Sequence, residues 1–286
     1  MATAHHLELE PADLAGNDGL GRYVLLPGSV GRVHRIARRL EGAEIRSNRR
    51  KLDAALGSIV LGGRRIDVAA LPTGMGCPSV DIVANELIQL GARRLLRVGT
   101  SGALQPSVRL GDLVIASAAV RDEATSDAYA PREVPAVADP VWVQALMQAA
   151  NDLGVASRVH VGLVHTKDSF FGREFGKGPD GDRNRAYMAH LMRCGVLASE
   201  MEAAHLFVLG TVFGAELAAG QPRAEGGPWC VSTLARREVP VRCGAVLAAI
   251  GDPEGGIIPL EEEQAAEERL IDLALGSLGV LAGWEF

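Results

Sequence analysis

The chain has 286 residues, a formal net charge of -6 and a pI near 5.7. An acidic protein of this kind lacks the basic field that general nucleic-acid or membrane-surface binding requires. With 48% hydrophobic and 22% charged residues, the composition excludes a largely disordered chain and predicts a large core. No linker-like stretch divides the sequence, so we expect one domain over residues 1–286.

Apolar runs and their spacing predict alternating strands and helices. The predicted strands cover residues 23–28, 58–72 (a hairpin turning at Gly62–Gly63), 93–99, 111–120, 159–165 and 229–232. The predicted helices cover residues 31–40, 80–91, 140–151, 185–194 and a segment that opens near Glu200. This alternation is typical of a mostly parallel sheet. Ligands of such sheets bind beyond the carboxyl ends of the strands, so the residues that follow each strand are the candidates for function.

Two strand ends carry groups that suit an anion. In "PGSVGR", Gly28 allows backbone N–H groups to approach a ligand, and Arg32 follows on a predicted helix. In "RVGTSG", Arg97 stands before a run of small residues that includes Thr100. Guanidinium groups match phosphate oxygens, so together these residues indicate a phosphate site, although each turn alone is more often structural. On the helix at 31–40 the spacing places Arg32, Arg35 and Arg39 away from the core stripe, and most arginines between 32 and 51 are expected to be solvated.

The segment "ASEMEAAHLF" places Glu200 and Glu202 at the start of an apolar helical run. Negative charge there favours the helix dipole, so capping is the first interpretation of both residues. A carboxylate can also accept hydrogen bonds from two vicinal hydroxyls, which a ribose offers. Because residues two apart point in different directions on a helix, we expect at most one of them to face a site.

Other signals are weak or negative. "GMGCPS" has Gly74 and Gly76, but Ser79 replaces the third glycine of a dinucleotide motif, which disfavours a dehydrogenase. The histidines form no ligand pattern, and we predict no catalytic metal and no cofactor.

The cysteines and the N-terminus bear on the cellular compartment. Cys77, Cys194, Cys230 and Cys243 are scattered and form no CxxC pair, which is typical of a reduced, cytoplasmic protein. The N-terminus has no signal-peptide pattern, and no apolar run is long enough to span a bilayer.

Taken in order, several segments resemble the nucleoside phosphorylase family, and most closely its hexameric uridine phosphorylase branch. They are "VLLPGSVGRV", "PTGMGCPS", "LGARRLLRVGTSGALQPSVRLGDLVIASAAVRD", "YAPREVPAVAD", "KDSFF" and "ASEMEAA", between about Tyr23 and Pro240. The resemblance implies a three-layer α/β/α sandwich with a mixed, mostly parallel central sheet. It also implies cleavage of an N-glycosidic bond by inorganic phosphate in a homo-oligomer, dimer-based and hexameric, whose sites are shared across the dimer interface.

Site residues follow from the same resemblance. The implied phosphate site consists of Gly28, Arg32, Arg97 and Thr100, with Arg49 lent across a subunit interface. The implied nucleoside site consists of Thr100, Phe170, Arg173, Glu200, Met201 and Glu202, with His6 on an N-terminal arm (residues 1–20) that reaches a neighbour's 5′-hydroxyl. Arg97 and Glu202 are the expected catalytic residues, the first on phosphate and the second on the ribose hydroxyls.

The sequence departs from the family where the base is bound. Purine enzymes of this fold have a Ser-Asp pair after the late strand, but Thr233 stands in the aspartate's place. Uridine enzymes usually have a Gln-x-Arg pair after the "SFF" segment and an arginine in the late loop, where this chain has Arg173-Glu174 and Leu234. This pattern is equally compatible with two interpretations. In the first, the contacts to the base are made instead by Arg173, Arg236 or Arg237. In the second, these arginines are ordinary surface charges. A monovalent-cation site is not carried over, because Arg50 stands where some uridine enzymes have a glutamate.

The sequence therefore predicts a cytoplasmic phosphorylase of a pyrimidine ribonucleoside, uridine first. Three alternatives stay open: a purine nucleoside phosphorylase with an atypical base pocket, a hydrolytic nucleosidase, and a non-catalytic nucleoside binder. The nucleosidase is disfavoured because water does not require the arginines Arg32 and Arg97.

Overall fold

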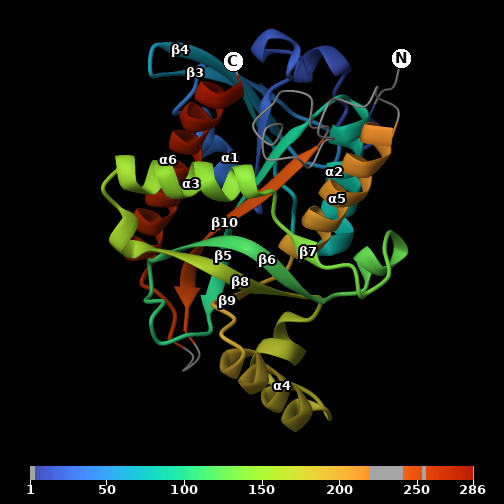
Figure 1. The fold of residues 1–286 in the computed structure, drawn as a ribbon, viewed down its shortest axis with the longest axis vertical. Coiled ribbons are helices and arrows are strands. Elements are labelled where there is room, and N and C mark those ends of the chain that lie inside the picture. Colours follow the sequence, from blue (N-terminus) through green and yellow to red (C-terminus); the bar gives the residue numbers. More distant parts are fainter. Residues whose placement is uncertain (1–3, 220–240, 253–255, 286) are drawn as a thin grey trace.

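The computed structural model describes residues 4–219, 241–252 and 256–285 (Figure 1). The predicted strand at 229–232 and the late-loop residues Thr233, Leu234, Arg236 and Arg237 lie outside the described residues. The elements are β1 (Tyr23–Pro27), α1 (Val30–Ala37), β2 (Glu41–Arg46), β3 (Ala54–Leu61), β4 (Arg64–Ala70), α2 (Cys77–Gln89), β5 (Arg94–Ala103), β6 (Leu113–Asp122), β7 (Ala136–Val137), α3 (Pro140–Asp152), β8 (Val159–Lys167), α4 (Gly181–Arg193), β9 (Ala198–Glu200), α5 (Ala203–Ala219), β10 (Arg242–Gly251) and α6 (Leu260–Glu285).

The strands form one mixed sheet in the order β10-β6-β8-β9-β5-β1-β4-β3-β2. Its centre is parallel: β1 pairs in this sense with β4 and β5, β5 with β10, and β8 with β6 and β9. The edge formed by β2 and β3 is antiparallel. Because β10 pairs with both β5 and β6, the strands β5, β10, β6, β8 and β9 close into a barrel-like circuit.

Helices cover both faces of this sheet, so the predicted fold class is confirmed. Along β1, Val24 and Leu26 face one core and Tyr23 and Leu25 face the other, as the period of a strand requires. The first core is completed by α2 and α5, and the second by α1, α3 and α6. Figure 1 shows these two helix layers on opposite sides of the strands, with α4 apart from both.

Local signals in the sequence account for most boundaries. Gly62 and Gly63 both have positive φ (58° and 78°), the conformation of a tight hairpin turn between β3 and β4. The helix expected to open near Glu200 begins at Ala203, because Glu200 still belongs to β9. The helix expected from Arg185 begins four residues earlier, at Gly181.

Among the described residues, no helix is both long and apolar enough to cross a membrane.

Candidate active site

Arg97, on β5, is buried between two carboxylates. The residue is 4% exposed, its Nε donates to Oε2 of Glu200 at 3.0 Å, and its Nη2 donates to Oε2 of Glu202. Burial lowers the pKa of Arg97, but Glu202 and Glu200 raise it more, so the side chain remains a cation. Its Nη1 is buried with no hydrogen-bond partner among the described residues. An unsatisfied buried donor costs about 1–3 kcal/mol, so this nitrogen is a candidate contact for a ligand oxygen.

The small residues after Arg97 make room for side chains that fold over β5. A Cβ placed on Gly99 would lie 2.8 Å from Nη2 of Arg97, so the guanidinium crosses the strand where a side chain is missing. A Cβ on Gly102 would lie 3.1 Å from Oε1 of Glu174. The glycines of "RVGTSG" are therefore required by close approach rather than by positive φ.

Both carboxylates of "EMEAA" reach Arg97, which corrects the expectation that at most one would face a site. Residues 200–202 precede α5, so their side chains do not follow helical spacing. Glu200 also caps the helix, as predicted: its carboxylate accepts the N–H groups of Glu202 and Ala203 at 2.9 Å. Glu202 accepts the N–H of Gly76, at the start of α2, at 2.7 Å.

The ends of β1, β4 and β5 lie side by side. Leu26 pairs with Arg97 and Pro27 with Val98. A Cβ on Gly28 would lie 3.6 Å from the carbonyl oxygen of Gly74, so the loops that follow β1 and β4 approach each other closely. The parallel register therefore brings Gly28, Arg97 and Thr100 together where the carboxyl ends of the strands meet, which we call the site edge of the sheet.

Arg32 is buried rather than solvated, which corrects the expectation for this face of α1. It is 6% exposed, its Nη1 donates to the carbonyl of Val98 at 3.1 Å, and its Nε donates to Oε1 of Glu267 at 3.1 Å. Arg35 also binds Glu267, and Arg39 contacts Asp272 at 2.9 Å. The helix α6 thus supplies carboxylates to the arginine face of α1. The contact with Val98 holds Arg32 beside the strand end that carries Arg97.

Arg49 and His6 do not join this cluster within the described chain. The Arg49 side chain is 74% exposed and pairs with Glu8. Nδ1 of His6 lies 2.6 Å from Oε1 of Glu86 on α2, and the N–H groups of His6 and Leu7 bind the same carboxylate. Burial raises the pKa of Glu86, but these hydrogen bonds lower it by more, so the pKa lies below its ordinary value. The expected roles of Arg49 and His6 across a subunit interface remain predictions.

Phe170 and Arg173 lie on a single π-helical turn, Phe170–Glu174. Phe170 is 46% exposed and packs edge to face against Phe171 and Phe175. Arg173 is held by Asp122, with Nε 2.6 Å from Oδ2, and by Asn184, whose Oδ1 accepts from Nη1 at 2.6 Å. Burial raises the pKa of Asp122, but hydrogen bonds from His165 and Arg173 lower it by more, so the pKa lies below its ordinary value. The guanidinium of Arg173 is therefore engaged in anchoring its own turn.

Sequence reasoning missed a group of buried polar residues beside the cluster. Nζ of Lys167, on β8, lies 2.7 Å from Oε2 of Glu174 and donates to Oγ of Ser199 at 2.7 Å. Thr166 donates to Glu200, which joins the group to the contacts of Arg97. The available signal was the polar run "HTKD" that ends the apolar strand β8, at the same sheet edge as the other candidates.

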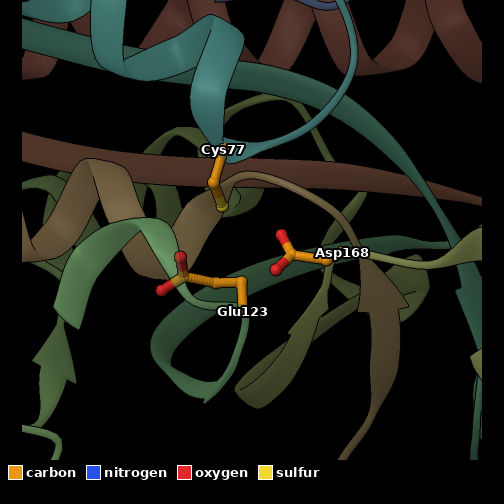
Figure 2. Close-up of side chains that lie close together, drawn as sticks. All are labelled: Cys77, Glu123 and Asp168. Carbon is orange, nitrogen blue, oxygen red and sulfur yellow. The ribbon is translucent and has the colours of Figure 1, made fainter. Parts of the chain in front are cut away.

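Cys77, Glu123 and Asp168 bring three potential metal-ligand atoms within 4.8 Å of one another (Figure 2). Each already has a hydrogen-bond partner: the Cys77 thiol donates to the carbonyl of Met201 at 3.2 Å, Glu123 accepts from Ser126 at 3.0 Å, and Asp168 accepts from Ala124 at 3.0 Å. Burial, with a contribution from Glu123, raises the pKa of the thiol, whereas metals bind the thiolate. We assign no metal to this group.

His205 links the start of α5 to α2. It is fully buried, its Nε2 lies 3.0 Å from Oδ1 of Asp81, and the hydroxyl of Tyr129 donates to the same oxygen at 2.6 Å. Nδ1 of His205 is buried without a partner among the described residues. Burial lowers the pKa of His205 below its ordinary 6.5, although Asp81 opposes the shift.

This burial predicts a pH-dependent contribution to stability. Below pH 6.5 the unfolded chain takes up the proton more readily than the folded one, so the contribution is full above pH 6.5 and is lost as the pH falls. We expect the free energy of unfolding in urea to fall more steeply below pH 6.5 in the wild type than in His205→Gln, by up to about 1.4 kcal/mol per pH unit. The exposed His34→Gln is the control, and equal slopes for wild type and His205→Gln would contradict the assignment.

Comparison with known proteins finds similar sequences that cover most of this chain. Residues 22–219 match the phosphorylase superfamily. The chain is 35% identical over 279 residues to uridine phosphorylase of Treponema pallidum, covering 97% of this chain and 93% of that protein. It is 38% identical to uridine phosphorylase of Thermococcus kodakarensis, over 73% of each chain. It is also 33% identical to guanosine phosphorylase of Halorubrum lacusprofundi, over 73% of this chain and 78% of that one.

The mixed sheet with helices on both faces is consistent with the fold of this superfamily, and the chain belongs to the phosphorylase superfamily. It is a nucleoside phosphorylase, a pentosyltransferase whose substrates are a nucleoside and phosphate.

Proposed function

We propose that this enzyme cleaves uridine with inorganic phosphate to give uracil and ribose 1-phosphate. The observation that carries the proposal is the buried Nη1 of Arg97, which lacks a partner among the described residues and lies on the same guanidinium that binds Glu200 and Glu202. A cation for phosphate and a carboxylate for ribose hydroxyls thus stand side by side. The names of the relatives from Treponema and Thermococcus support uridine as the nucleoside.

In the proposed reaction, phosphate contacts Arg97, Thr100 and the backbone at Gly28. Arg32, whose guanidinium binds Glu267 and the carbonyl of Val98, adds positive charge beside the same strand end. A phosphate oxygen forms the bond to C1′ while the C1′–N bond breaks and its electron pair leaves with the base. The proton of hydrogen phosphate ends on the base, so uridine and hydrogen phosphate give ribose 1-phosphate and neutral uracil. Fixed cations and a carboxylate favour this charge distribution more in the transition state than in the substrates, which is the source of catalysis.

The ribose is proposed to lie on Met201 with its 2′- and 3′-hydroxyls on Glu202. Glu202 is held in place by the N–H of Gly76. Holding both substrates at one sheet edge removes much of the entropic cost of their encounter.

We further propose that the chain is a single domain that works in the cytoplasm as a homo-oligomer, dimer-based and hexameric. In this arrangement Arg49 and His6 of one subunit complete the site of the next. The side chain of Arg49 is 74% exposed and that of His6 is 28% exposed, so both retain surface that a neighbouring subunit could contact.

Phosphate dependence is the decisive test. We expect uracil release from uridine to require phosphate and to be accompanied by stoichiometric ribose 1-phosphate. Release that proceeds equally well without phosphate would indicate a nucleosidase, and binding without turnover would indicate a nucleoside binder. The relative from Halorubrum makes guanosine the second candidate substrate, so guanosine and inosine are assayed in parallel with uridine.

A further inference from the structure

Lys167 and Glu174 form a buried ion pair whose position calls for an explanation. Lys167 is 2% exposed, and its Nζ lies 2.7 Å from Oε2 of Glu174. Burying such a pair rarely gains stability over apolar residues of similar size, because both charges lose their hydration. This cost, together with the contact of Lys167 with Ser199 next to Glu200, argues for a functional role of the pair.

The pair borders the candidate site on two sides. In the register of β8 and β9, Thr166 lies opposite Glu200. Lys167, the next residue on β8, is therefore close to the segment proposed to bind the ribose. Glu174 lies over Gly102, two residues beyond Thr100 on β5. The pair thus lies between the segment proposed for the ribose and the segment proposed for phosphate.

Both charged groups retain hydrogen-bonding capacity. Lys167 and Ser199 both contact Oε2 of Glu174, at 2.7 and 3.1 Å, and Oε1 has no hydrogen-bond donor among the described residues. Nζ of Lys167 has three donors, and the described residues account for two of them, through Ser199 and Glu174. A free donor and a free acceptor therefore stand side by side.

An aromatic face lies next to the same two groups. Nζ of Lys167 is 5.8 Å from the centroid of the Phe170 ring, which is partly exposed. Arg173, between Phe170 and Glu174, is bound to Asp122 and Asn184 and does not offer its guanidinium to a ligand. It instead fixes the turn so that Glu174 faces Lys167.

We propose that Lys167 and Glu174 read the base of the nucleoside, in place of Arg173. The pair matches a lactam edge, in which a carbonyl oxygen accepts from Lys167 and the adjacent ring N–H donates to Glu174. Uracil, hypoxanthine and guanine present this edge, whereas cytosine and adenine present an amino group beside a ring nitrogen acceptor, the reverse order. This inference rests on the proposed phosphorolysis.

The same contact assists bond cleavage. As the C1′–N bond breaks, the departing electron pair is delocalised onto the carbonyl oxygen of the base. The ammonium group of Lys167 faces that oxygen, so its hydrogen bond strengthens in the transition state. No proton needs to leave Lys167, because hydrogen phosphate supplies the proton that the base gains.

The test compares kcat/KM for uridine and cytidine, and for inosine and adenosine, at saturating phosphate. We expect the wild type to favour the lactam member of at least one pair by ~100-fold or more, because a site built for a hydrogen bond rejects a base that leaves it unpaired. In Lys167→Met and Glu174→Gln, we expect this ratio to fall at least ~10-fold while KM for phosphate changes little. Lys177→Met and Glu133→Gln, at exposed positions, are matched controls that should keep the wild-type ratio.

The ratio separates base recognition from general damage. A purely structural role of the pair would lower kcat/KM for all nucleosides by one factor and leave the ratio unchanged, which would overturn the inference. Calorimetric binding of free uracil against cytosine gives the same comparison without turnover, for variants of low activity. If the wild type released no base from any nucleoside in the presence of phosphate, the proposed function itself would fail, a result distinguishable from an unchanged ratio.

Discussion

Arg97→Ala is expected to lower kcat/KM by at least ~10³-fold, the largest single loss at this site. The substitution removes the proposed contact to phosphate and also the cation between Glu200 and Glu202. Two buried carboxylates without their cation destabilise the fold by about 3–5 kcal/mol, so a lower thermal midpoint is also expected. Activity is measured at saturating uridine with phosphate varied, below the unfolding temperature of the variant.

Arg97→Lys separates catalysis from folding. Lysine keeps the charge, so we expect most of the lost stability to return, but its single ammonium cannot contact both carboxylates and a phosphate oxygen in the geometry of the guanidinium. Turnover should therefore remain at least ~10-fold below that of the wild type. Arg109→Ala, at an exposed arginine, serves as the control. Near-normal activity of Arg97→Ala would remove Arg97 from the site.

The architecture was predictable because it follows from short-range patterns. Apolar runs of strand length and helical spacing located most of the described elements, and Gly62–Gly63 located the hairpin turn. Gly28, Arg97 and Thr100 follow the carboxyl ends of parallel strands, and such ends meet on one side of a sheet, so the sequence alone predicts that these residues lie close together.

The partners of the arginines were not predictable, because they come from distant parts of the chain. Glu267, on the last helix, determines that Arg32 is buried, and no local pattern relates two residues so far apart. Similarly, helical spacing was applied to Glu200 and Glu202, although β9 extends through Glu200 and the helix starts only at Ala203. A strand of three residues carries too little periodicity to be recognised in sequence.

The residues proposed to contact the base illustrate a different limit. The resemblance points to Arg173 as a base contact because it follows the "SFF"-like segment, but Asp122 and Asn184 bind its guanidinium in the folded chain. Lys167 and Glu174 are seven residues apart, and nothing in the sequence indicates that they meet. In the folded chain the π-helical turn Phe170–Glu174 ends with this carboxylate in contact with Lys167 at the end of β8.

Glu202→Gln is expected to lower kcat/KM for uridine by about 100-fold, because the two charge-assisted hydrogen bonds proposed between Glu202 and the ribose would become neutral ones. For 2′-deoxyuridine, which retains only one of the two hydroxyls, the same substitution should cost about 10-fold. The comparison matters because Glu202 also binds Arg97, and a loss transmitted only through Arg97 would be equal for both nucleosides. Glu133→Gln, at an exposed carboxylate, is the matched control.

The pH profile provides an independent measure of Glu202. Burial raises the pKa of this carboxyl and Glu200 adds to the effect, while Arg97 opposes it, because one cation does not compensate two buried carboxylates. Since the ribose hydroxyls require the ionised form, the acidic limb of kcat/KM for uridine should lie above the ordinary glutamate value of 4.5. In Glu202→Gln this limb should disappear and leave a lower, flatter profile. Rates are referred to the concentration of the hydrogen phosphate dianion, so that the ionisation of phosphate itself does not contribute to the limb. A limb that then persists unchanged in the variant would assign the titration to another group and leave Glu202 without a role as an ionised ribose acceptor.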